Sequence, residues 1–311
     1  MNYPNFYERQ RVGTLYRPRI SEVIREANSL ALNPSSGDER RILLLLVDPQ
    51  VDFIHADGTL SVPGAVDDTR RTIEWLFDNL ELVTDIIVSL DSHYPLHIFY
   101  PGWWVDEAGK QPEALTPITT QEVEDGRWRP MFEEEWSLYY VHELEKKAKK
   151  TLLIWPYHTM IGAMGHAITP ALYEAITFHS GARRSLPTYV VKGRIHKTEH
   201  YSIFEPEVKV PEDPEGGLNT RLLERMSTYD RIYIAGQAKS HCVLETVASI
   251  VNLADSRPEL VRNVRLLADC MSSVVHPDID FEAMANETLE GYAKLGLRLV
   301  SAADPIELAA L

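Results

Sequence analysis

Three residues with chemically useful side chains, Asp48, Lys192 and Cys242, each lie at or just beyond the end of a strand-like apolar stretch. In an open α/β sheet, side chains at the carboxyl ends of parallel strands converge on one crevice. A carboxylate, an amine and a thiol brought together there would form the site of an amidase with a cysteine nucleophile. These three residues are therefore the candidate catalytic groups of the chain.

Cys242 lies where a predicted strand turns into a predicted helix. Gly236 and Ser240 precede it in a turn, and the residues that follow it have the pattern of an amphipathic helix. A helix N-terminus can depress the pKa of a thiol, and backbone N–H groups at such a corner can hold an oxyanion. The alternative is a buried structural cysteine, which is the role that we assign to Cys270 because it lacks this context.

Asp48 follows a run of six apolar residues, a position where a carboxylate is costly unless it has partners. Burial would raise its pKa, which suits a base that takes a proton from a thiol. Lys192 nearby would lower that pKa again and could stabilise negative charge in the transition state. Asp52 is expected to anchor the turn. A strand-end Asp taken alone is more often a turn residue or a helix cap, but three such strand ends together favour catalysis.

A second group of candidate residues follows the apolar run 86–90. Asp91 and His93 lie two residues apart there, so both side chains can point into one cavity. His158 could supply a third metal ligand, and His97 is a candidate fourth. Imidazole with carboxylate suits Zn, Mn or Fe, and three protein ligands with open positions describe a catalytic metal site. Seven further histidines are expected in surface or core positions: His55, His142, His166, His179, His196, His200 and His276.

Short apolar runs alternate with helical patterns along the chain. Strands are predicted at 42–48, 85–90, 151–154, 187–192, 230–235, 264–268 and 297–300, and helices near 67–80, 169–179, 218–228, 242–254 and 280–294. Continuous apolar runs are typical of strands that are buried on both faces. The alternation of strand and helix implies right-handed crossovers and a mostly parallel sheet that is covered on both sides.

Two segments look like additions to an α/β core of roughly 200 residues. Residues 1–40 would form an N-terminal extension, with a helix beginning near Ser21, ahead of a hydrolase-like domain at 41–311. Residues 103–150 interrupt the alternation with a Pro- and acid-rich stretch and a helical run from about Glu133. This insertion contains four tryptophans: Trp103, Trp104, Trp128 and Trp136. A surface loop seldom needs so many, so they would cap the active site or form a subunit interface.

The composition is that of a soluble globular protein, since 44% of the 311 residues are hydrophobic and 25% are charged. The net charge of −15 argues against a nucleic-acid backbone or an anionic membrane as the main partner. No apolar stretch approaches the roughly 18 to 20 residues of a membrane span, and the first residues lack the apolar core of a secretory signal. Cys242 and Cys270 are the only cysteines, which favours a reducing cytoplasm.

These residues resemble the cysteine hydrolase superfamily of isochorismatase and nicotinamidase, and most closely its nicotinamidase/pyrazinamidase branch. Residues 47–53 resemble the family motif D-x-Q-x-D-F, and residues 236–243 resemble G-x-A-x-x-x-C-V. Residues 91–97 and 155–158 resemble D-W-H-P-x-x-H and W-P-x-H, while Lys192-Gly193 is similar to the segment that holds the family's lysine. The motifs occur in family order and span most of the chain outside the two additions.

The resemblance implies a three-layer α/β/α fold with a central, mostly parallel sheet and a cis peptide bond between Gln237 and Ala238. It implies a divalent metal, with zinc preferred to manganese or iron, that is held by the ligands named above and binds the ring nitrogen of the substrate. It also implies that Phe53 and Trp155 sandwich that ring. We further expect a homo-oligomer.

The sequence departs from the family pattern in two motifs and in length. Ser92 stands where the family has Trp, and His241 stands where nicotinamidases often have Tyr. The insertion at 103–150 would start beside the metal site, so it could reshape or close the pocket. These departures concern the identity of the substrate more than the chemistry.

The expected reaction is hydrolysis of a small carboxamide, with nicotinamide as the leading substrate, to the carboxylate and ammonia. Asp48 would take the proton of Cys242, the thiolate would form a thioester, and the backbone N–H groups of Ala238 and Cys242 would hold the oxyanion. One alternative is a superfamily hydrolase that acts on a ureido compound or another small amide. A second is a non-catalytic binding protein whose working surface is the Trp-rich insertion.

Overall fold

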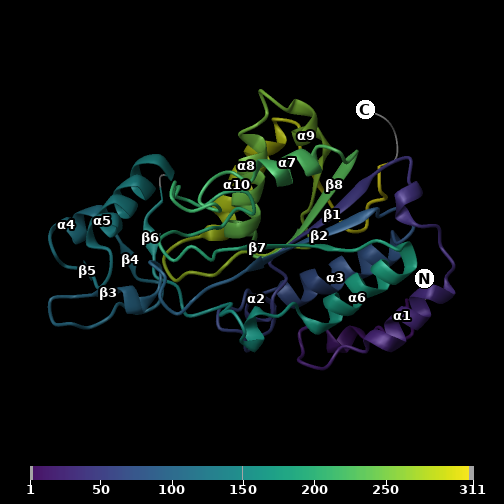
Figure 1. Cartoon of the computed structure of the whole chain (residues 1–311), viewed down its shortest axis with the longest axis horizontal. Helices are drawn as coiled ribbons and strands as arrows, with labels where there is room; N and C mark the ends of the chain where they lie inside the picture. Colours follow the sequence, from purple (N-terminus) through teal and green to yellow (C-terminus); the bar gives the residue numbers. More distant parts are fainter. Residues whose placement is uncertain (1–2, 149, 308–311) are drawn as a thin grey trace.

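The structure is a computed structural model that describes residues 3–148 and 150–307. Its centre is a sheet of six strands in the order β10-β9-β8-β1-β2-β7 (Figure 1), and every neighbouring pair is parallel. The strands are β1 (Ile42–Val47), β2 (Asp85–Asp91), β7 (Thr188–Lys192), β8 (Arg231–Gly236), β9 (Val264–Leu267) and β10 (Arg298–Val300). Parallel neighbours need crossover connections, and helices fill them here.

Helices cover both faces of this sheet (Figure 1). One face carries α3 (Ala65–Asp78) and α6 (Pro170–Arg183), with α1 (Ile20–Ser29) packed on α6. The other face carries α7 (Thr220–Met226), α8 (Leu244–Val251), α9 (Pro258–Asn263) and α10 (Phe281–Ala293). The predicted three-layer α/β/α fold with a parallel central sheet is therefore confirmed.

The sequence of β1 explains why both faces are covered. Leu43 and Leu45 pack in one cluster with side chains of α7, α8 and α9, whereas Leu44 and Leu46 pack with α3 and α6 on the opposite face. Successive side chains of a strand point to opposite faces, so a strand without polar positions needs a helical layer on each side. Because the whole strand is buried, the next residue, Asp48, lies at a strand end inside the protein.

The residues before β1 pack along the outside of α6. Phe6 shares an apolar cluster with Phe178 of α6. The buried carboxylate of Glu174, also on α6, accepts hydrogen bonds from the hydroxyl of Tyr16 at 2.8 Å and from the backbone N–H of Arg19 at 2.6 Å. The segment is thus held by both apolar and polar contacts. Its status as an extension outside the hydrolase-like domain stays a prediction.

The insertion forms a lobe, residues 103–148 and 150–153, at the left end of the molecule in Figure 1. Two short antiparallel strand pairs build it, β3 (Trp104–Val105) with β5 (Arg129–Pro130) and β4 (Pro117–Ile118) with β6 (Leu152–Leu153). Two helices complete it, α4 (Thr120–Glu124) and α5 (Glu134–Glu143). After α5 the chain continues as a π-helix, Leu144–Ala148, so the helical run predicted from about Glu133 is confirmed over residues 134–148.

The strand predicted at 151–154 does not belong to the central sheet. Only Leu152–Leu153 is a strand, and it pairs antiparallel with β4 of the lobe. Its apolar side chains are buried in a cluster that the lobe shares with the segment around Phe99 and Trp155. The apolar run therefore reflects burial in a second core, which a single sequence does not distinguish from burial in the sheet.

The four tryptophans of the lobe form its interior. Trp103 and Trp104 are fully buried, Trp128 is nearly so, and Trp136 is half-buried. The indole N–H of Trp103 donates to Ser137 Oγ at 2.9 Å. The indole N–H of Trp104 donates to the backbone oxygen of Ile98 at 2.6 Å, which ties the lobe to the segment that follows β2. Packing of a small domain-like unit therefore explains why so many tryptophans are present.

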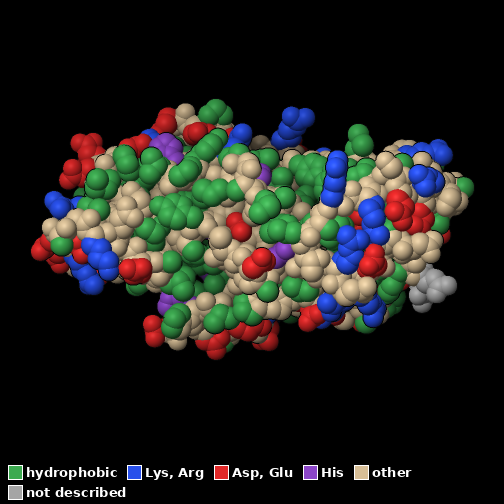
Figure 2. All heavy atoms as spheres, turned by 90° about the horizontal axis from the view of Figure 1, so that it is seen from below, with side chains coloured by type: hydrophobic (Ala, Val, Ile, Leu, Met, Phe, Trp, Pro, Cys, Tyr) green, Lys and Arg blue, Asp and Glu red, His purple; other side chains and the backbone are tan. Residues whose placement is uncertain are grey.

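Figure 2 shows the face of the molecule on the side of α1, α6 and the short helix α2 (Val51–Ile54). Hydrophobic side chains are spread over this face between acidic and basic groups. A groove lined by Leu15, Val51, Tyr173 and Tyr189 lies where α2, α6 and the edge strand β7 meet. None of the helices within 3–148 and 150–307 is long and apolar enough to cross a membrane.

Candidate active site

Four neighbouring strands of the sheet end at one cavity. Asp48 directly follows β1, Asp91 is the last residue of β2, Lys192 is the last residue of β7, and Cys242 follows β8 after a turn. These strands are adjacent in the order β8-β1-β2-β7, so their carboxyl ends lie together. The structure therefore brings together the residues that the sequence pattern marked as catalytic.

The ammonium group of Lys192 contacts the other candidate catalytic groups. Its Nζ lies 2.9 Å from Oδ2 of Asp48, 2.8 Å from Oδ1 of Asp91 and 3.5 Å from Sγ of Cys242. It also donates to the backbone oxygen of His200 at 2.8 Å. One buried cation thus contacts two buried carboxylates and the sulfur atom.

Burial and the neighbouring charges determine the pKa values of Lys192 and Asp48. Burial alone would lower the pKa of Lys192, but the carboxylates of Asp48 and Asp91 raise that pKa well above its usual value. For Asp48, burial raises the pKa, while Lys192 and a hydrogen bond from Ser89 lower it. Ser89, which the sequence pattern did not mark, donates to Asp48 Oδ1 at 2.6 Å. The carboxyl group is therefore basic and oriented, as a proton acceptor must be.

The pKa of Cys242 is raised well above the usual value of a thiol, chiefly by burial and also by the nearby carboxylates, although Lys192 opposes this. The expected depression by a helix N-terminus is therefore wrong. Cys242 lies inside a π-type turn, Lys239–Val243, ahead of α8, and its side chain is only 6% exposed. Such a thiol is protonated at rest and needs an adjacent base to become a nucleophile.

The turn before Cys242 depends on a glycine. Gly236 has φ +130°, and a Cβ at this position would collide with the backbone oxygen of Val47. The backbone N–H of Gln237 donates to that same oxygen at 2.9 Å. The peptide bond between Gln237 and Ala238 is cis, as the resemblance implies. Ala238 and Cys242, the predicted oxyanion-binding residues, both line the cavity.

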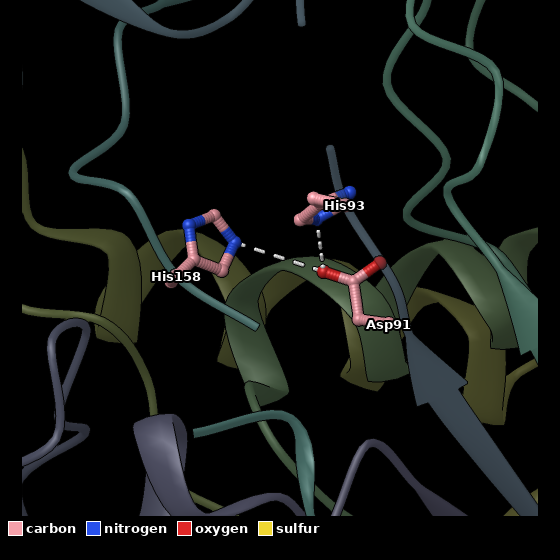
Figure 3. Close-up of side chains that lie close together, drawn as sticks. All are labelled: Asp91, His93 and His158. Carbon is pink, nitrogen blue, oxygen red and sulfur yellow. Dashed lines mark hydrogen bonds and ion pairs between the residues drawn. The ribbon is translucent and has the colours of Figure 1, made fainter. Parts of the chain in front are cut away.

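Asp91, His93 and His158 form the candidate metal site (Figure 3). Their ligand atoms all lie within 4.8 Å of one another, and all three side chains are buried. Oδ2 of Asp91 is 2.7 Å from Nε2 of His93 and 3.7 Å from Nε2 of His158. Burial would raise the pKa of Asp91, but His93 and Lys192 hold it well below its usual range.

The donor set fits a divalent cation. Nδ1 of His93 lies 3.0 Å from the backbone oxygen of Gly193, and Nδ1 of His158 lies 2.7 Å from that of Pro156. A carbonyl oxygen only accepts, so Nδ1–H of each ring donates to it and Nε2 of each ring faces the Asp91 carboxylate. Two imidazole nitrogens and a carboxylate oxygen that converge in this way are a donor set that a divalent cation such as zinc prefers. A hydrogen bond from the second ring nitrogen is also the usual way to orient a metal-bound histidine.

His97, the candidate fourth ligand, is not a member of this group. Its ring packs against that of His93 with the centroids 5.0 Å apart, and its Nε2 accepts a hydrogen bond from the backbone N–H of Tyr94 at 3.1 Å. Burial lowers the pKa of His97 to about 2. The structure thus brings together three of the four predicted ligands and gives the fourth a different contact.

Gln50 and Gly193, which belong to the recognised motifs, help to position the metal ligands. The side-chain amide of Gln50 accepts from the backbone N–H of Asp91 and donates to its backbone oxygen, both at 2.7 Å. Gly193 has φ +80°, and a Cβ there would lie 2.7 Å from the His93 ring and 2.8 Å from Asp91 Oδ1. Asp52 accepts from the backbone N–H of Thr159 at 2.7 Å, which confirms its predicted anchoring role.

The cavity beside Cys242 has mostly aromatic walls. Phe53 and Trp155, the predicted ring-binding residues, both line it. Its other lining residues are Leu60, Asp91, His93, Phe99, His158, Glu199, His200, Tyr201, Ala238, His241, Cys242 and Val274. His200, which the sequence assigned to a surface or core position, also lines this cavity. Glu199 and Phe99 were missed because no sequence pattern marks them.

The geometry defines a three-layer α/β protein with a buried Asp, Lys and Cys beside a candidate metal site. No family model and no curated protein matches the sequence. Among solved structures, the yeast nicotinamidase Pnc1p bound to the inhibitor nicotinaldehyde is 17% identical, with a TM-score of 0.55 over 84% of this chain and 99% of that chain.

Two further solved structures have the same fold. An Acinetobacter baumanii nicotinamidase/pyrazinamidase is 18% identical, with a TM-score of 0.55 over 86% of this chain and 99% of that one. PnC1 from L. infantum in complex with nicotinate is 17% identical, with a TM-score of 0.51 over 86% of this chain and 95% of that one. At these identities the comparison establishes a shared fold.

Proposed function

We propose that the chain is a cysteine amidohydrolase that converts a small aromatic carboxamide, with nicotinamide as the leading candidate, to the carboxylate and ammonia. The observation that carries the proposal is the set of contacts of Lys192 Nζ with Asp48, Asp91 and Cys242 at the floor of an aromatic cavity. A buried base, cation and thiol in contact are the parts that acyl transfer needs.

In the first half of the reaction, the proton of Cys242 moves to Asp48 and the sulfur attacks the carboxamide carbon. The negative charge then moves to the carbonyl oxygen, where backbone N–H groups at Ala238 and Cys242 would stabilise it. When the C–N bond breaks, Asp48 returns the proton to the nitrogen, and ammonia leaves. The acyl group is now a thioester on Cys242.

In the second half, Asp48 takes a proton from a water molecule whose oxygen attacks the thioester. The C–S bond breaks, the proton held by Asp48 returns to the sulfur, and the carboxylic acid product loses its remaining proton to solvent to become the carboxylate. Lys192 keeps its proton throughout, because two carboxylates contact it. Its fixed positive charge opposes the build-up of negative charge at each step.

Asp91, His93 and His158 would hold the divalent metal, with zinc preferred to manganese or iron for two imidazoles and one carboxylate. When bound, the metal would supply a Lewis-acidic site for a ring nitrogen or a water molecule. The three residues keep that site oriented through the backbone oxygens of Gly193 and Pro156.

The substrate class is suggested by the cavity walls and by the ligands of the similar structures. Phe53 and Trp155 offer aromatic faces for a planar ring. The similar yeast and L. infantum proteins are described with nicotinaldehyde and nicotinate, which are pyridine compounds. The competing substrate class is another small amide or a ureido compound. Residues of the lobe pack in the same apolar cluster as Phe53 and Trp155, so the lobe can shape the pocket for a substrate other than nicotinamide.

The decisive experiment measures ammonia release from nicotinamide by the purified chain. We expect release by the wild type and none by Cys242→Ala, while Cys270→Ala, a change at the second buried cysteine, should retain activity. Intact activity of Cys242→Ala would refute the mechanism. Failure of Cys242 to react with an alkylating agent would favour a non-catalytic binding protein.

The metal assignment has its own test. Metal analysis of the purified protein should find about one divalent ion per chain in the wild type and none in His158→Ala. Chelation should lower the activity, and added zinc, manganese or iron should restore it to different extents. Full activity with no metal bound would refute the assignment.

We further propose a homo-oligomer in a reducing compartment such as the cytoplasm. Tyr189 and Val191 of the edge strand β7 are 41% and 42% exposed, which gives this edge an apolar surface. Cys242 and Cys270 are both free. Light scattering of the purified chain would test the oligomer, and a monomer at all concentrations would refute it.

A further inference from the structure

Glu199 is an unexpected carboxylate in the wall of the aromatic cavity. It lines the same space as Cys242 and Phe53, and its side chain is only 4% exposed. A buried carboxylate in an otherwise aromatic wall is costly unless donors surround it. The proposed reaction does not use this residue, so its presence needs another explanation.

The donors around Glu199 are distributed unevenly between its two oxygens. Oε1 accepts from the indole N–H of Trp155 at 2.7 Å and from the hydroxyl of Tyr201. Among the residues 3–148 and 150–307, only Tyr140 donates to Oε2, through its hydroxyl at the long distance of 3.3 Å. A carboxylate can accept about four hydrogen bonds. Oε2 therefore has capacity for at least one more donor.

No described residue forms an ion pair with Glu199. The nearby ammonium of Lys150 instead pairs with Glu207 at 2.5 Å and with Glu245 at 2.7 Å. Burial raises the pKa of Glu199, while Tyr201 and Trp155 lower it. A further N–H donor from the cavity would stabilise the ionised form in the same way.

The lobe takes part in this arrangement. Tyr140 belongs to α5, and its hydroxyl oxygen also accepts the backbone N–H of Glu199 at 3.3 Å. Trp155, which offers a face for the substrate ring, is held by Glu199 through its indole N–H. Glu199 thus connects the lobe, one cavity wall and the open space beside the nucleophile.

We propose that Glu199 is a specificity-determining residue that selects aromatic amides carrying an N–H donor, such as an amino group, on the ring edge away from the carboxamide. It would disfavour rings that present an acceptor or a negative charge at that edge. This inference rests on the proposed amidase function and narrows its substrate class. A site built for a hydrogen-bonding group discriminates strongly against analogues that lack it.

Glu199→Gln separates this role from a merely structural one. The glutamine oxygen can still accept from Trp155 and Tyr201, and its amide N–H can donate to the hydroxyl oxygen of Tyr140. Trp155 and Tyr201 therefore keep their acceptor and the contact with Tyr140 is kept with its direction reversed, whereas the negative charge and the remaining acceptor capacity of Oε2 are lost. Glu134→Gln is the matched control, because it removes the same charge from an exposed position at the start of α5.

The kinetic test compares nicotinamides that carry either an amino or a methyl group at the same ring carbon. For at least one position we expect kcat/KM of the amino compound to exceed that of its methyl partner by about tenfold, as expected for one hydrogen bond to a charged group. The ratio should fall at least threefold in Glu199→Gln and stay at the wild-type value in Glu134→Gln. The electronic effect of the amino group is common to all variants, so the change in ratio isolates the contact.

An unchanged ratio in Glu199→Gln, including an equal loss of kcat/KM for both compounds, would overturn the inference and leave Glu199 a structural residue. Calorimetric binding of the same pairs to Cys242→Ala separates this result from failure of the proposed function. A binding preference for the amino compound that Glu199→Gln abolishes, without ammonia release by the wild type, would support Glu199 and refute the amidase. Ammonia release by the wild type, with no preference for the amino compound in either assay, would support the amidase and refute the role of Glu199.

Discussion

The strands β1, β2 and β8 of the central sheet contain six or seven residues, whereas each strand of the lobe contains two. The sheet is held by long runs of apolar residues between two helical layers, and the lobe is held by buried tryptophans. Short strand pairs have little stability of their own, so side-chain packing must define the lobe. The two regions therefore reach an ordered fold by different means.

The difference extends to the site. Asp48, Asp91 and Lys192 lie at the ends of strands of the central sheet, and Cys242 lies in the turn that follows β8, so the sheet positions all four. The lobe contributes Tyr140 and the aromatic cluster behind the cavity wall. Changes in the lobe can therefore alter which substrate fits without moving the reacting groups.

The largest expected effect comes from breaking the core site. Lys192→Met removes the cation between Asp48 and Asp91, so kcat/KM should fall about 10³-fold and the free energy of unfolding by about 3–5 kcal/mol. Kinetics and urea denaturation measure the two effects. Lys209→Met, at an exposed lysine, should change neither. Activity of Lys192→Met near that of the wild type would show that the cation is dispensable.

A substitution in the lobe tests whether the two regions are independent. Trp104→Ala removes a fully buried indole and should lower the free energy of unfolding by about 3–5 kcal/mol. Hydrogen exchange should show loss of protection in α4 and α5 while β1 and β8 stay protected. Met131→Ala, at an exposed position of the lobe, is the control. Equal loss of protection in β1 would mean that lobe and core unfold as one unit.

Acid should weaken the core through His179 on α6. Its Nε2–H donates to the backbone oxygen of Val83 at 2.9 Å, and burial, aided by the charge of Arg183, lowers the pKa of His179 to about 4. Asp85 and Asp38 oppose this shift. The unfolded chain binds the proton near pH 6.5, so stability is full above that pH and falls by up to about 3 kcal/mol as the pH drops towards 4.

Denaturation midpoints at several pH values measure this loss of stability. His179→Gln keeps a donor for Val83 but cannot titrate, so its stability should depend less on pH between 6.5 and 4. The same slope in both proteins would assign the acid sensitivity to other groups.

The smallest expected effect concerns the contact between lobe and cavity. Tyr140→Phe removes one donor to Glu199, which should change the ratio of kcat/KM for the amino and methyl compounds by threefold to tenfold, about 1 kcal/mol. Tyr139→Phe, at the adjacent exposed tyrosine, should leave the ratio unchanged. A larger effect of Tyr140→Phe on kcat for both compounds alike would show that the lobe influences the chemistry itself.

Sequence alone predicted those elements whose pattern has one physical cause. The apolar run that ends at Asp48 is a strand buried on both faces, whereas the run that ends at Lys192 forms the edge strand β7, in which Tyr189 and Val191 are exposed. The run at 151–154 is buried too, but in the lobe, and burial alone does not say which core a residue joins. The short helix α9 was missed because its six residues contain too few turns for a periodic pattern.

The residues of the site also differ in whether a sequence pattern marks them. Asp91, His93 and His158 were predicted because carboxylate and imidazole ligands follow a strand or lie in a recognised motif. Glu199 and Ser89 were not predicted, because their importance arises only from what the folded chain places beside them. The raised pKa of Cys242 was also missed, since it depends on the extent of burial rather than on position before a helix.

The turn at Lys192-Gly193 positions two parts of the site, the cation beside the nucleophile and one of the metal ligands. Lys192 supplies the ammonium beside Cys242, and the backbone oxygen of the very next residue fixes the tautomer of His93. One peptide unit therefore sets both the spacing of the nucleophile from its cation and the aim of a metal ligand. A substitution that shifts this turn would move the Lys192 ammonium and the His93 ring together. The sequence of the turn can therefore vary only where neither geometry changes.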